Sequence, residues 1–346
     1  MQLPDTAVIE LTALCNHKCF FCCCPWENSV EKPNKELSTD EWKKAIQLYR
    51  FYGVNHFTFT GGEAVLRKDL SELIQFTHSL GCSIGVVTNG RAVTDELLET
   101  FKKFDVLLSI SVPGIETFKS NTGVDNLENV LNLFRKCNEI GVKTVANIAV
   151  SKSNFNELYQ NISYPIMYGA DYILLNRFLP GGRGLKYQEK LLSNDEINEM
   201  LDIAEEILNK SGLNGHIGTE LPYCIIKEPS KYKRLQVAST CGAAKGFFVT
   251  DPEGNVKTCN HSPNKLCKWS EVSSLENNEY WKIFTERTYR PKMCDGCKSI
   301  DICDGGCREA ANVANGAVNA NDPCFGIKRR NSATREIYQK ILSVCV

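Results

Sequence analysis

Six apolar runs of strand length alternate with amphipathic segments of helix length along the first half of the chain. Each run is short and almost continuously apolar, as parallel strands that are buried on both faces usually are. Parallel neighbours need crossover connections, and a series of right-handed crossovers rolls a sheet into an open or closed barrel. The alternation therefore predicts an α/β fold with a parallel sheet, with strands at residues 7–12, 56–60, 83–88, 106–111, 142–150 and 172–175.

Helix start signals fill the intervals between these runs. Ser38-Thr-Asp-Glu41 is a capping-box pattern, and the apolar residues Trp42 and Ile46 follow it at helical spacing. A second capping box, Ser193 to Glu196, starts a helix that we expect to run to about residue 210. The remaining helices are expected at residues 69–80, 94–103, 126–140 and 154–168.

Polar residues and cysteines gather where the expected strands end. In a parallel barrel the carboxyl ends of the strands meet at one rim, and catalytic residues come from that rim. The first strand leads into a loop with three cysteines, and the second strand delivers a Gly-Gly-Glu turn. We therefore expect the active site at this rim, formed by the cysteine loop together with Gly61, Gly62, Glu63, Thr88, Asn89, Ser109, Ser111 and Asn147.

The cysteine loop has the spacing of a metal site. Cys15, Cys19 and Cys22 form a C-x3-C-x2-C run, and so short a loop can wrap three thiolates around one metal centre. Three protein ligands leave a position open for an outside molecule, although the spacing alone also allows a zinc knuckle or buried thiols. The chain has 17 cysteines and no export signal, so we expect metal ligation in a reducing cytoplasm rather than a disulfide scaffold.

A second group of cysteines lies in the last third of the chain. Between Cys241 and Cys259, the strand-like segments 247–250 and 255–258 flank Asp-Pro-Glu-Gly, which predicts a hairpin. The hairpin should bring the two cysteines together, as a metal site requires. A pair of zinc ribbons is the alternative that C-x2-C pairs allow. The group continues with Cys294, Cys297, Cys303, Cys307 and Cys324.

The C-x3-C-x2-C run resembles the signature of the radical S-adenosylmethionine (SAM) enzymes. The resemblance implies that Cys15, Cys19 and Cys22 hold a [4Fe–4S] cluster whose fourth iron binds the amino and carboxylate groups of SAM. Phe21 matches a position that is usually aromatic in the family and packs on the adenine. The family fold, a partial (β/α)6 TIM-like barrel, agrees with the strand pattern.

Gly61-Gly62-Glu63 resembles the GGE motif of the same family, in which the glutamate binds the methionyl amine. The paired glycines would expose backbone amides beside that carboxylate. The family usually continues with proline, where this chain has Ala64. Arg177 and Arg183 follow the sixth strand and either hold a substrate or SAM carboxylate or are solvated. Thr88, Asn89, Ser109 and Asn147 match family positions that hydrogen-bond the ribose, the methionyl carboxylate or the adenine. The alternative is that these four residues cap helices or satisfy turns.

The seven C-terminal cysteines resemble the SPASM domain, which carries two auxiliary [4Fe–4S] clusters. Many members place a further inner ligand six residues after the first cysteine, where this chain has Phe247. The fourth inner ligand is therefore Cys224, Cys267 or an outside group. Cys23 and Cys24 are expected to pack under the cluster loop, with one of them able to lie near the substrate, and Cys82, Cys137 and Cys345 match no pattern. The family's interleaved order implies Cys294, Cys297, Cys303 and Cys324 for the outer cluster and Cys241, Cys259 and Cys307 for the inner one.

The resemblance implies a radical SAM/SPASM maturase with SAM and three [4Fe–4S] clusters. Such an enzyme cleaves SAM to a 5′-deoxyadenosyl radical and oxidatively modifies a residue of a ribosomally made peptide or protein, by a thioether or carbon–carbon crosslink or by side-chain oxidation. The alternative within the family is the modification of a tetrapyrrole or another small cofactor precursor. From a different class, the alternative is a non-catalytic module that binds zinc or a cluster.

Composition and domain layout complete the expectations. The composition changes near residue 220, which predicts a barrel domain over residues 1–220 and a SPASM domain over residues 221–346. A net charge of −1 with interspersed signs and the lack of a long apolar run indicate neither a nucleic-acid nor a membrane partner. The expected partners are the precursor peptide or protein and an electron donor such as flavodoxin or ferredoxin. Because the first strand starts by Ala7, we expect a leader peptide to bind either a separate leader-peptide-binding protein or the barrel and SPASM surfaces directly.

Overall fold

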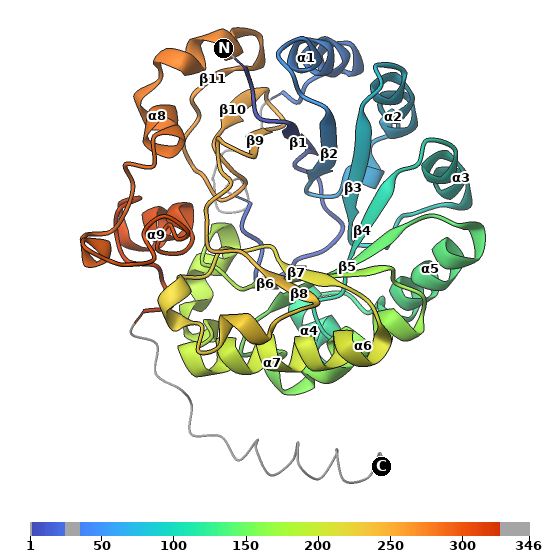
Figure 1. Ribbon diagram of the computed structural model, residues 1–346. Helices are drawn as coiled ribbons and strands as arrows, with labels where there is room; N and C mark the ends of the chain where they lie inside the picture. The colour runs from blue at the N-terminus through green and yellow to red at the C-terminus, as the bar shows by residue number, and fades with distance from the viewer. Residues whose placement is uncertain (1, 25–34, 326–346) are drawn as a thin grey trace.

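One sheet organises the part of the chain that the structure describes, residues 2–24 and 35–325 of a computed structural model. Its strands are β1 (Thr6–Thr12), β2 (His56–Gly61), β3 (Ser83–Thr88), β4 (Leu107–Ser111), β5 (Thr144–Val150), β6 (Tyr172–Arg177), β7 (Gly215–Ile217), β8 (Leu235–Val237), β9 (Phe247–Thr250), β10 (Asn255–Lys257) and β11 (Cys267–Lys268). They form an 11-stranded sheet in the order β11-β10-β9-β1-β2-β3-β4-β5-β6-β7-β8. The order has two ends, β11 and β8, so the barrel in Figure 1 is open.

The helices cover the outside of this sheet. They are α1 (Thr39–Phe51), α2 (Leu70–Ser79), α3 (Asp95–Lys103), α4 (Phe118–Thr122), α5 (Leu127–Ile140), α6 (Leu158–Met167), α7 (Asn194–Ser211), α8 (Glu279–Thr285) and α9 (Arg308–Asn315). Figure 1 shows α1, α2, α3, α5 and α6 around the ring of strands, with α8 and α9 on the side of β9–β11. Among residues 2–24 and 35–325, none of the helices combines the length and apolar character needed to cross a membrane.

The predicted barrel of parallel strands is confirmed. All six expected strands are present, each neighbour pair from β1 to β6 is parallel, and no strand end differs from its predicted position by more than two residues. The sheet also continues beyond the six strands, because β7 and β8 add to one end and β9 pairs in parallel with β1 at the other. The sixth helix starts at Leu158 rather than 154, because Phe155–Glu157 forms a separate 3₁₀ turn.

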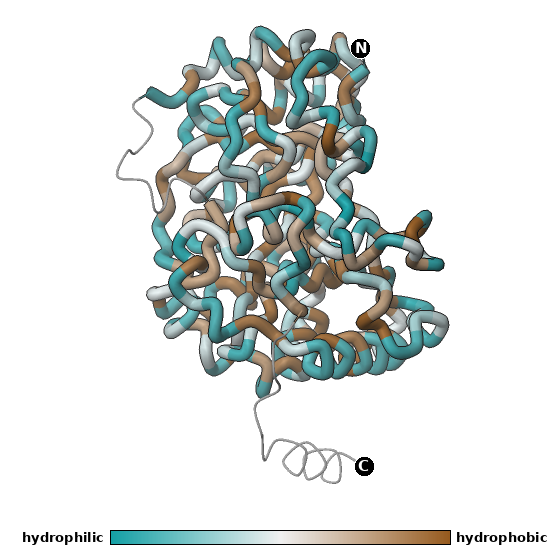
Figure 2. The backbone as a smooth tube through the Cα atoms, turned by 90° about the vertical axis from the view of Figure 1, so that its left-hand side faces the viewer, coloured by the Kyte–Doolittle hydropathy of each residue, from teal (hydrophilic) through white to brown (hydrophobic). Residues whose placement is uncertain are grey.

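Capping and one apolar face explain the first helix. The Ser38 side chain accepts a hydrogen bond from the Glu41 backbone N–H, and the Glu41 carboxylate accepts one from the Ser38 backbone, as the capping box predicts. The helix buries Trp42 and Tyr49, and the Tyr49 hydroxyl lies 2.8 Å from the Thr250 hydroxyl on β9. Figure 2 shows the resulting alternation of hydrophilic and hydrophobic colour along the outer helices.

The predicted hairpin of β9 and β10 is confirmed, and it belongs to the barrel sheet. A buried ion pair adds to the strand pairing, because the Lys257 Nζ on β10 lies 2.9 Å from Glu10 Oε2 on β1 and both side chains are at most 3% exposed. The cysteine-rich region therefore shares a sheet and a polar core contact with the barrel. The division of the chain at residue 220 stays a prediction.

Candidate active site

Two adjoining cavities lie inside the barrel, toward the carboxyl-terminal ends of its strands. The smaller, about 240 Å³, lies against the cysteine loop, and the larger, about 430 Å³, borders the β9–β10 hairpin. Phe21, Cys23 and Cys24 line both of them, as does Ser111 at the end of β4. The active site is therefore at the predicted rim, and its interior reaches from the first group of cysteines to the second.

The three cysteines of the predicted triad, Cys15, Cys19 and Cys22, all line the smaller cavity. Contacts to distant elements fix the loop that carries them. The Lys18 backbone N–H donates to the Thr122 carbonyl at the end of α4 at 2.8 Å. The Arg183 guanidinium donates to the Cys19 carbonyl, also at 2.8 Å. The loop is thus docked on two later segments, with its thiols directed to a common space.

Close backbone approach explains why two glycines follow β2. The Gly62 N–H donates to the Thr12 carbonyl at 2.7 Å, and the Glu63 N–H donates to the Leu14 carbonyl at 2.8 Å. A Cβ on Gly61 would overlap the Thr12 carbonyl, a Cβ on Gly62 would overlap that of Leu14, and Gly61 has φ +130°. The expectation that the glycines expose amides for a ligand is thus wrong for Gly62 and Glu63, whose amides bind the start of the cysteine loop.

Glu63 is a buried carboxyl group held by the end of β3. Its Oε1 accepts a hydrogen bond from the Thr88 hydroxyl at 2.8 Å, and its Oε2 accepts one from the Asn89 backbone N–H at 2.7 Å. Burial raises the pKa of Glu63 to about 7, although the bonds from Asn89, Thr88 and the Val65 N–H partly offset that effect. Thr88 and Asn89 therefore orient the carboxylate of Glu63, which lines the smaller cavity with the cysteines.

The other predicted contacts divide between the two cavities. Phe21 lines both cavities and therefore lies between them. Asn147 on β5 lines the larger cavity and accepts a hydrogen bond from the Asn176 side chain at 2.9 Å. Ser109 lines neither of these cavities, whereas Ser111 lines both. The two serines share a face of β4 because side chains alternate along a strand, and Ser111 is the one at the rim.

Arg177, at the end of β6, and Arg183, which follows that strand, both have structural partners. Arg177 is 3% exposed, and its guanidinium binds both carboxylate oxygens of Asp322 at 2.6 and 2.8 Å. The alternative of a solvated Arg177 is therefore wrong, whereas its binding of a substrate or SAM carboxylate stays a prediction, because Arg177 also lines the larger cavity. Arg183 lines the smaller cavity while it binds the Cys19 carbonyl.

The cysteines predicted for the inner auxiliary cluster line the larger cavity. Cys241, Cys259 and Cys307 all contribute to its wall, and all three are less than 10% exposed. Cys241 precedes the β9–β10 hairpin and Cys259 follows it, as the sequence predicts. Burial raises the pKa of each thiol, so that a bound metal or a nearby cation is needed to hold them as thiolates.

Neither thiol considered as a fourth inner ligand lies on the larger cavity's wall. Burial raises the pKa of the Cys224 thiol, and the nearby thiols of Cys303 and Cys297 raise it further. Cys224 therefore lies beside the predicted outer group. Cys267 is on β11, where burial raises the pKa of its thiol to about 11 and the Ser274 side chain binds it. Cys82 and Cys137 are buried in the core as expected, and Cys345 lies outside the described residues.

Several polar residues of the larger cavity were not found from the sequence. Glu10, Glu220, Glu309 and His261 all line it, and Asn260 joins them while it donates to Glu10 at 3.0 Å. Glu10 had one available signal, because a carboxylate inside a buried apolar strand needs a partner. The others lie on irregular segments after β7 and β10 or at the start of α9, where no periodic pattern points to them.

The donor chemistry of the two cavities fits iron–sulfur clusters. Thiolates are the ligands that such clusters use, and each cavity has its three predicted ligand cysteines on its wall, together with Cys23 and Cys24. The smaller one also holds a carboxylate beside the cysteines, as a site for an amine ligand requires. Within the described ranges, no three or more His, Cys, Asp or Glu side chains surround a single-ion position. The metal assignments therefore depend on donor chemistry and on the family pattern.

Comparisons with known proteins show which family this chain is similar to. Residues 9–160 match the model of the radical SAM superfamily. The PqqA peptide cyclase of Bradyrhizobium diazoefficiens is 25% identical over 94% of this chain and 87% of its own length. The PqqA peptide cyclase of Xanthomonas campestris is 24% identical over 92% of this chain and 86% of its own.

Solved structures agree with this result at the level of the fold. Streptococcus suis SuiB bound to the precursor peptide SuiA has a TM-score of 0.72 at 17% identity, over 94% of this chain and 76% of that one. anSMEcpe with bound AdoMet and a peptide has a TM-score of 0.73 at 16% identity and covers 99% of both chains. The first half of the chain thus matches the radical SAM superfamily, and the chain over most of its length is similar in sequence to PqqA peptide cyclases and in fold to SuiB and anSMEcpe.

Proposed function

We propose that this enzyme oxidatively modifies a residue of a ribosomally made precursor peptide. The observation that carries the proposal is the pair of adjoining cavities with shared wall residues, one lined by the triad cysteines and the other by the inner C-terminal cysteines. A substrate residue in these cavities lies between the two predicted cluster sites. The PqqA peptide cyclases and the peptide-bound SuiB and anSMEcpe structures favour a peptide over a tetrapyrrole.

Three [4Fe–4S] clusters and SAM are the proposed cofactors. Cys15, Cys19 and Cys22 hold the SAM-binding cluster, and Glu63 binds the methionyl amine of SAM. When bound, SAM and the reduced cluster supply a radical that removes a hydrogen atom from the substrate. The chain holds SAM, aims the substrate and excludes water, for which Phe21, Phe178 and Phe247 provide apolar walls. The remaining proposed SAM contacts are Gly61, Gly62, Thr88, Asn89 and Asn147, without Ser109, which lines neither cavity. The proposed cluster ligands are Cys241, Cys259 and Cys307 for the inner cluster and Cys294, Cys297, Cys303 and Cys324 for the outer cluster.

The other proposed partners follow from this chemistry. Reduction of the SAM-binding cluster needs an external electron donor such as flavodoxin or ferredoxin. The leader part of the precursor peptide binds either a separate protein or the surface of this chain, and the enzyme works in the cytoplasm, where thiols stay reduced. The inner cluster has its fourth position open, because Cys224 and Cys267 lie away from the larger cavity's wall.

The protonation of Glu63 should make SAM binding depend on pH. The raised pKa of about 7 leaves this carboxyl group neutral in acid, whereas an ammonium ligand favours the carboxylate. Binding thus lowers the pKa, and SAM affinity should be lost as the pH falls through about 7, by up to about 10-fold per pH unit. Calorimetric titration of anaerobic holoenzyme with SAM between pH 5.5 and 8.5 measures this affinity over more than about one pH unit on either side of the pKa.

Glu63→Gln is the matched control for that titration. Glutamine keeps the size of the side chain and removes the titrating group, so the variant should bind SAM weakly and with a flat pH profile. A wild-type profile that is equally flat, or a variant that keeps the wild-type slope, would show that Glu63 does not face the amine.

A direct assay tests the proposed function. Reduced holoenzyme is incubated anaerobically with SAM and with the precursor peptides encoded beside its gene, and the peptides are analysed by mass spectrometry. We expect one peptide to lose two hydrogens per modification, with 5′-deoxyadenosine formed in proportion. SAM cleavage with every neighbouring peptide unchanged, and with a tetrapyrrole precursor oxidised instead, would contradict the peptide assignment.

A further inference from the structure

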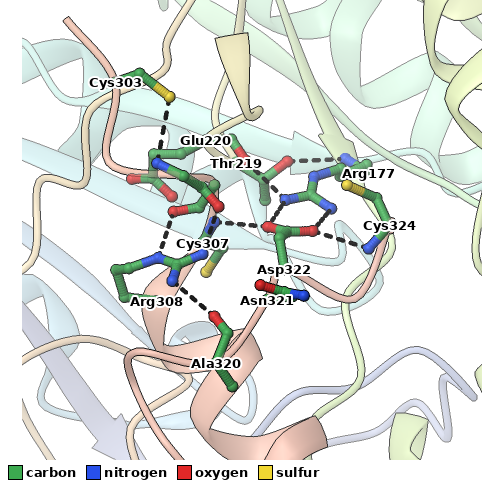
Figure 3. A network of polar contacts seen from close by, with 12 residues as sticks. Arg177, Thr219, Glu220, Cys303, Cys307, Arg308, Ala320, Asn321, Asp322 and Cys324 are labelled. Atoms are coloured by element: carbon green, nitrogen blue, oxygen red, sulfur yellow. Dashed lines mark hydrogen bonds and ion pairs between the residues drawn. The ribbon is translucent and has the colours of Figure 1, made fainter. Parts of the chain in front are cut away.

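One buried carboxylate connects the barrel to both predicted auxiliary sites (Figure 3). Asp322 is 1% exposed, and each of its oxygens accepts two hydrogen bonds. Oδ1 accepts from Arg177 at 2.8 Å and from the Cys324 backbone N–H at 2.9 Å. Oδ2 accepts from Arg177 at 2.6 Å and from the Cys307 backbone N–H at 2.8 Å. Arg177 ends strand β6, so a single side chain joins a barrel strand to two cysteines.

The surrounding chain is built around this carboxylate. Gly306 has φ +93°, and a Cβ at that position would overlap the Asp322 carboxylate, so only glycine fits beside it. Arg308 is fully buried and donates to the carbonyls of Val318 and Ala320 at 3.1 and 2.9 Å, which fixes the segment leading to Asp322. The position of Asp322 is therefore determined from both sides.

A second aspartate, Asp304, does the same for one other cysteine of the inner group. The Asp304 side chain is fully buried, accepts from the Cys241 backbone N–H at 2.7 Å and pairs with Arg287, also at 2.7 Å. Within the described part of the chain, the Asp304 carboxylate accepts no hydrogen bond from the backbone N–H of another cysteine. The two carboxylates thus differ in reach, since Asp322 holds one inner and one outer cysteine and Asp304 holds one inner cysteine.

We propose that Asp322, held by Arg177, is a positioning residue that sets the two auxiliary cluster sites together. The inference rests on the proposed function, in which Cys307 belongs to the inner cluster and Cys324 to the outer one. Outer-shell partners of metal ligands orient those ligands and tune the metal, and hydrogen bonds near cluster sulfurs set reduction potentials. By accepting the N–H groups of both cysteines, Asp322 keeps them from donating to cluster sulfur.

Asp322→Asn is the sharpest variant, because asparagine has the same shape but a single acceptor oxygen. It cannot accept from Arg177 on both sides and from both cysteine amides, so at least one cysteine N–H loses its partner. Loss of outer-shell partners typically lowers metal affinity about 10- to 100-fold. The freed N–H and the lost negative charge should also raise the reduction potentials of both auxiliary clusters.

The experiment uses full-length chain in a Cys15→Ala/Cys19→Ala/Cys22→Ala background, so that all bound iron is auxiliary. After anaerobic reconstitution, iron and sulfide are counted, clusters are titrated with a chelator, and potentials are measured by redox-poised electron paramagnetic resonance. For D322N we expect the chelator concentration that removes half of the iron to fall by about 10- to 100-fold, with both signals shifted. For Asp304→Asn we expect a shift in one signal alone.

Glu205→Gln is the matched structural control. Glu205 on α7 also accepts backbone N–H groups, those of Lys233 and Leu235 at 2.8 and 2.9 Å, but none from a cysteine. This variant should lose stability and keep wild-type clusters. Should D322N fail to fold because Arg177 is left unpaired, the double variant D322N/R177Q removes both charges and should show the same cluster defects.

The outcomes separate the inference from the proposed function. Wild-type iron and potentials in D322N or the double variant, or an equal iron loss in E205Q, would overturn the positioning role. A background chain that binds no iron would instead overturn the auxiliary cluster sites, and the inference with them.

Discussion

Replacing Cys15, Cys19 or Cys22 by alanine should abolish reductive SAM cleavage and leave the auxiliary iron in place. The three side chains line one cavity with Glu63, apart from the C-terminal group, so each loss affects only the site near the amino end. Even outer-shell substitutions lower metal affinity about 10- to 100-fold, so the loss of a ligand should exceed 100-fold. The measurement is 5′-deoxyadenosine formed by dithionite-reduced enzyme, with iron counted on the same samples.

Cys82→Ala is the control for this series. Its thiol is buried in the core just before β3 and donates hydrogen bonds to the Val54 and Leu80 carbonyls at 3.9 Å. The variant should cleave SAM at the wild-type rate. Unchanged 5′-deoxyadenosine formation in any of the three triad variants would refute the assignment of that cysteine.

Cys307→Ala should have the opposite pattern, with SAM cleavage retained and product formation lost. Cys307 is 7% exposed and lines the larger cavity, beyond the residues of the smaller one. The substrate must give up an electron after it loses a hydrogen atom, and the proposed auxiliary clusters accept that electron. The variant should therefore form 5′-deoxyadenosine while peptide modification falls by more than about 100-fold, by the same ligand argument. Cys297→Ala, at the outer site, should behave in the same way.

Cys267→Ala is the matched control in the cysteine-rich region. This thiol is on β11 and lines neither cavity, so its removal should change neither readout. Normal modified peptide from Cys307→Ala would remove the inner cluster from the reaction. Loss of SAM cleavage in the same variant would show that the two sites are not independent.

Local patterns accounted for most of the barrel. Apolar strand runs and capping boxes are short-range signals, so β1 to β6 and the helix starting after Ser38 were predictable from a few neighbouring residues. The strands β7 and β8 have three residues each, too few for a period to be recognised. The pairing of β9 with β1 joins residues far apart in the chain, which no local pattern encodes.

The site residues were predictable where the chemistry of the residue type decides their role. They were not predictable where the role depends on a contact with a distant segment. Cysteine spacing and the Gly-Gly-Glu turn led to residues that line one cavity. The role of the glycines was misread, because the chain that approaches Gly62 comes from Leu14 on another element. The alternative of a solvated Arg177 is wrong for the same reason, since its carboxylate partner Asp322 lies in the C-terminal region. Contacts between distant segments are set by the fold and have no signal in the neighbouring sequence.

Iron and acid-labile sulfide per chain, measured on anaerobically purified and reconstituted protein, test the central claim most directly. Three [4Fe–4S] clusters predict about 12 of each for the wild type, and about 8 of each for the Cys15→Ala/Cys19→Ala/Cys22→Ala variant. Zinc without sulfide, or fewer than about 4 iron per wild-type chain, would contradict the account.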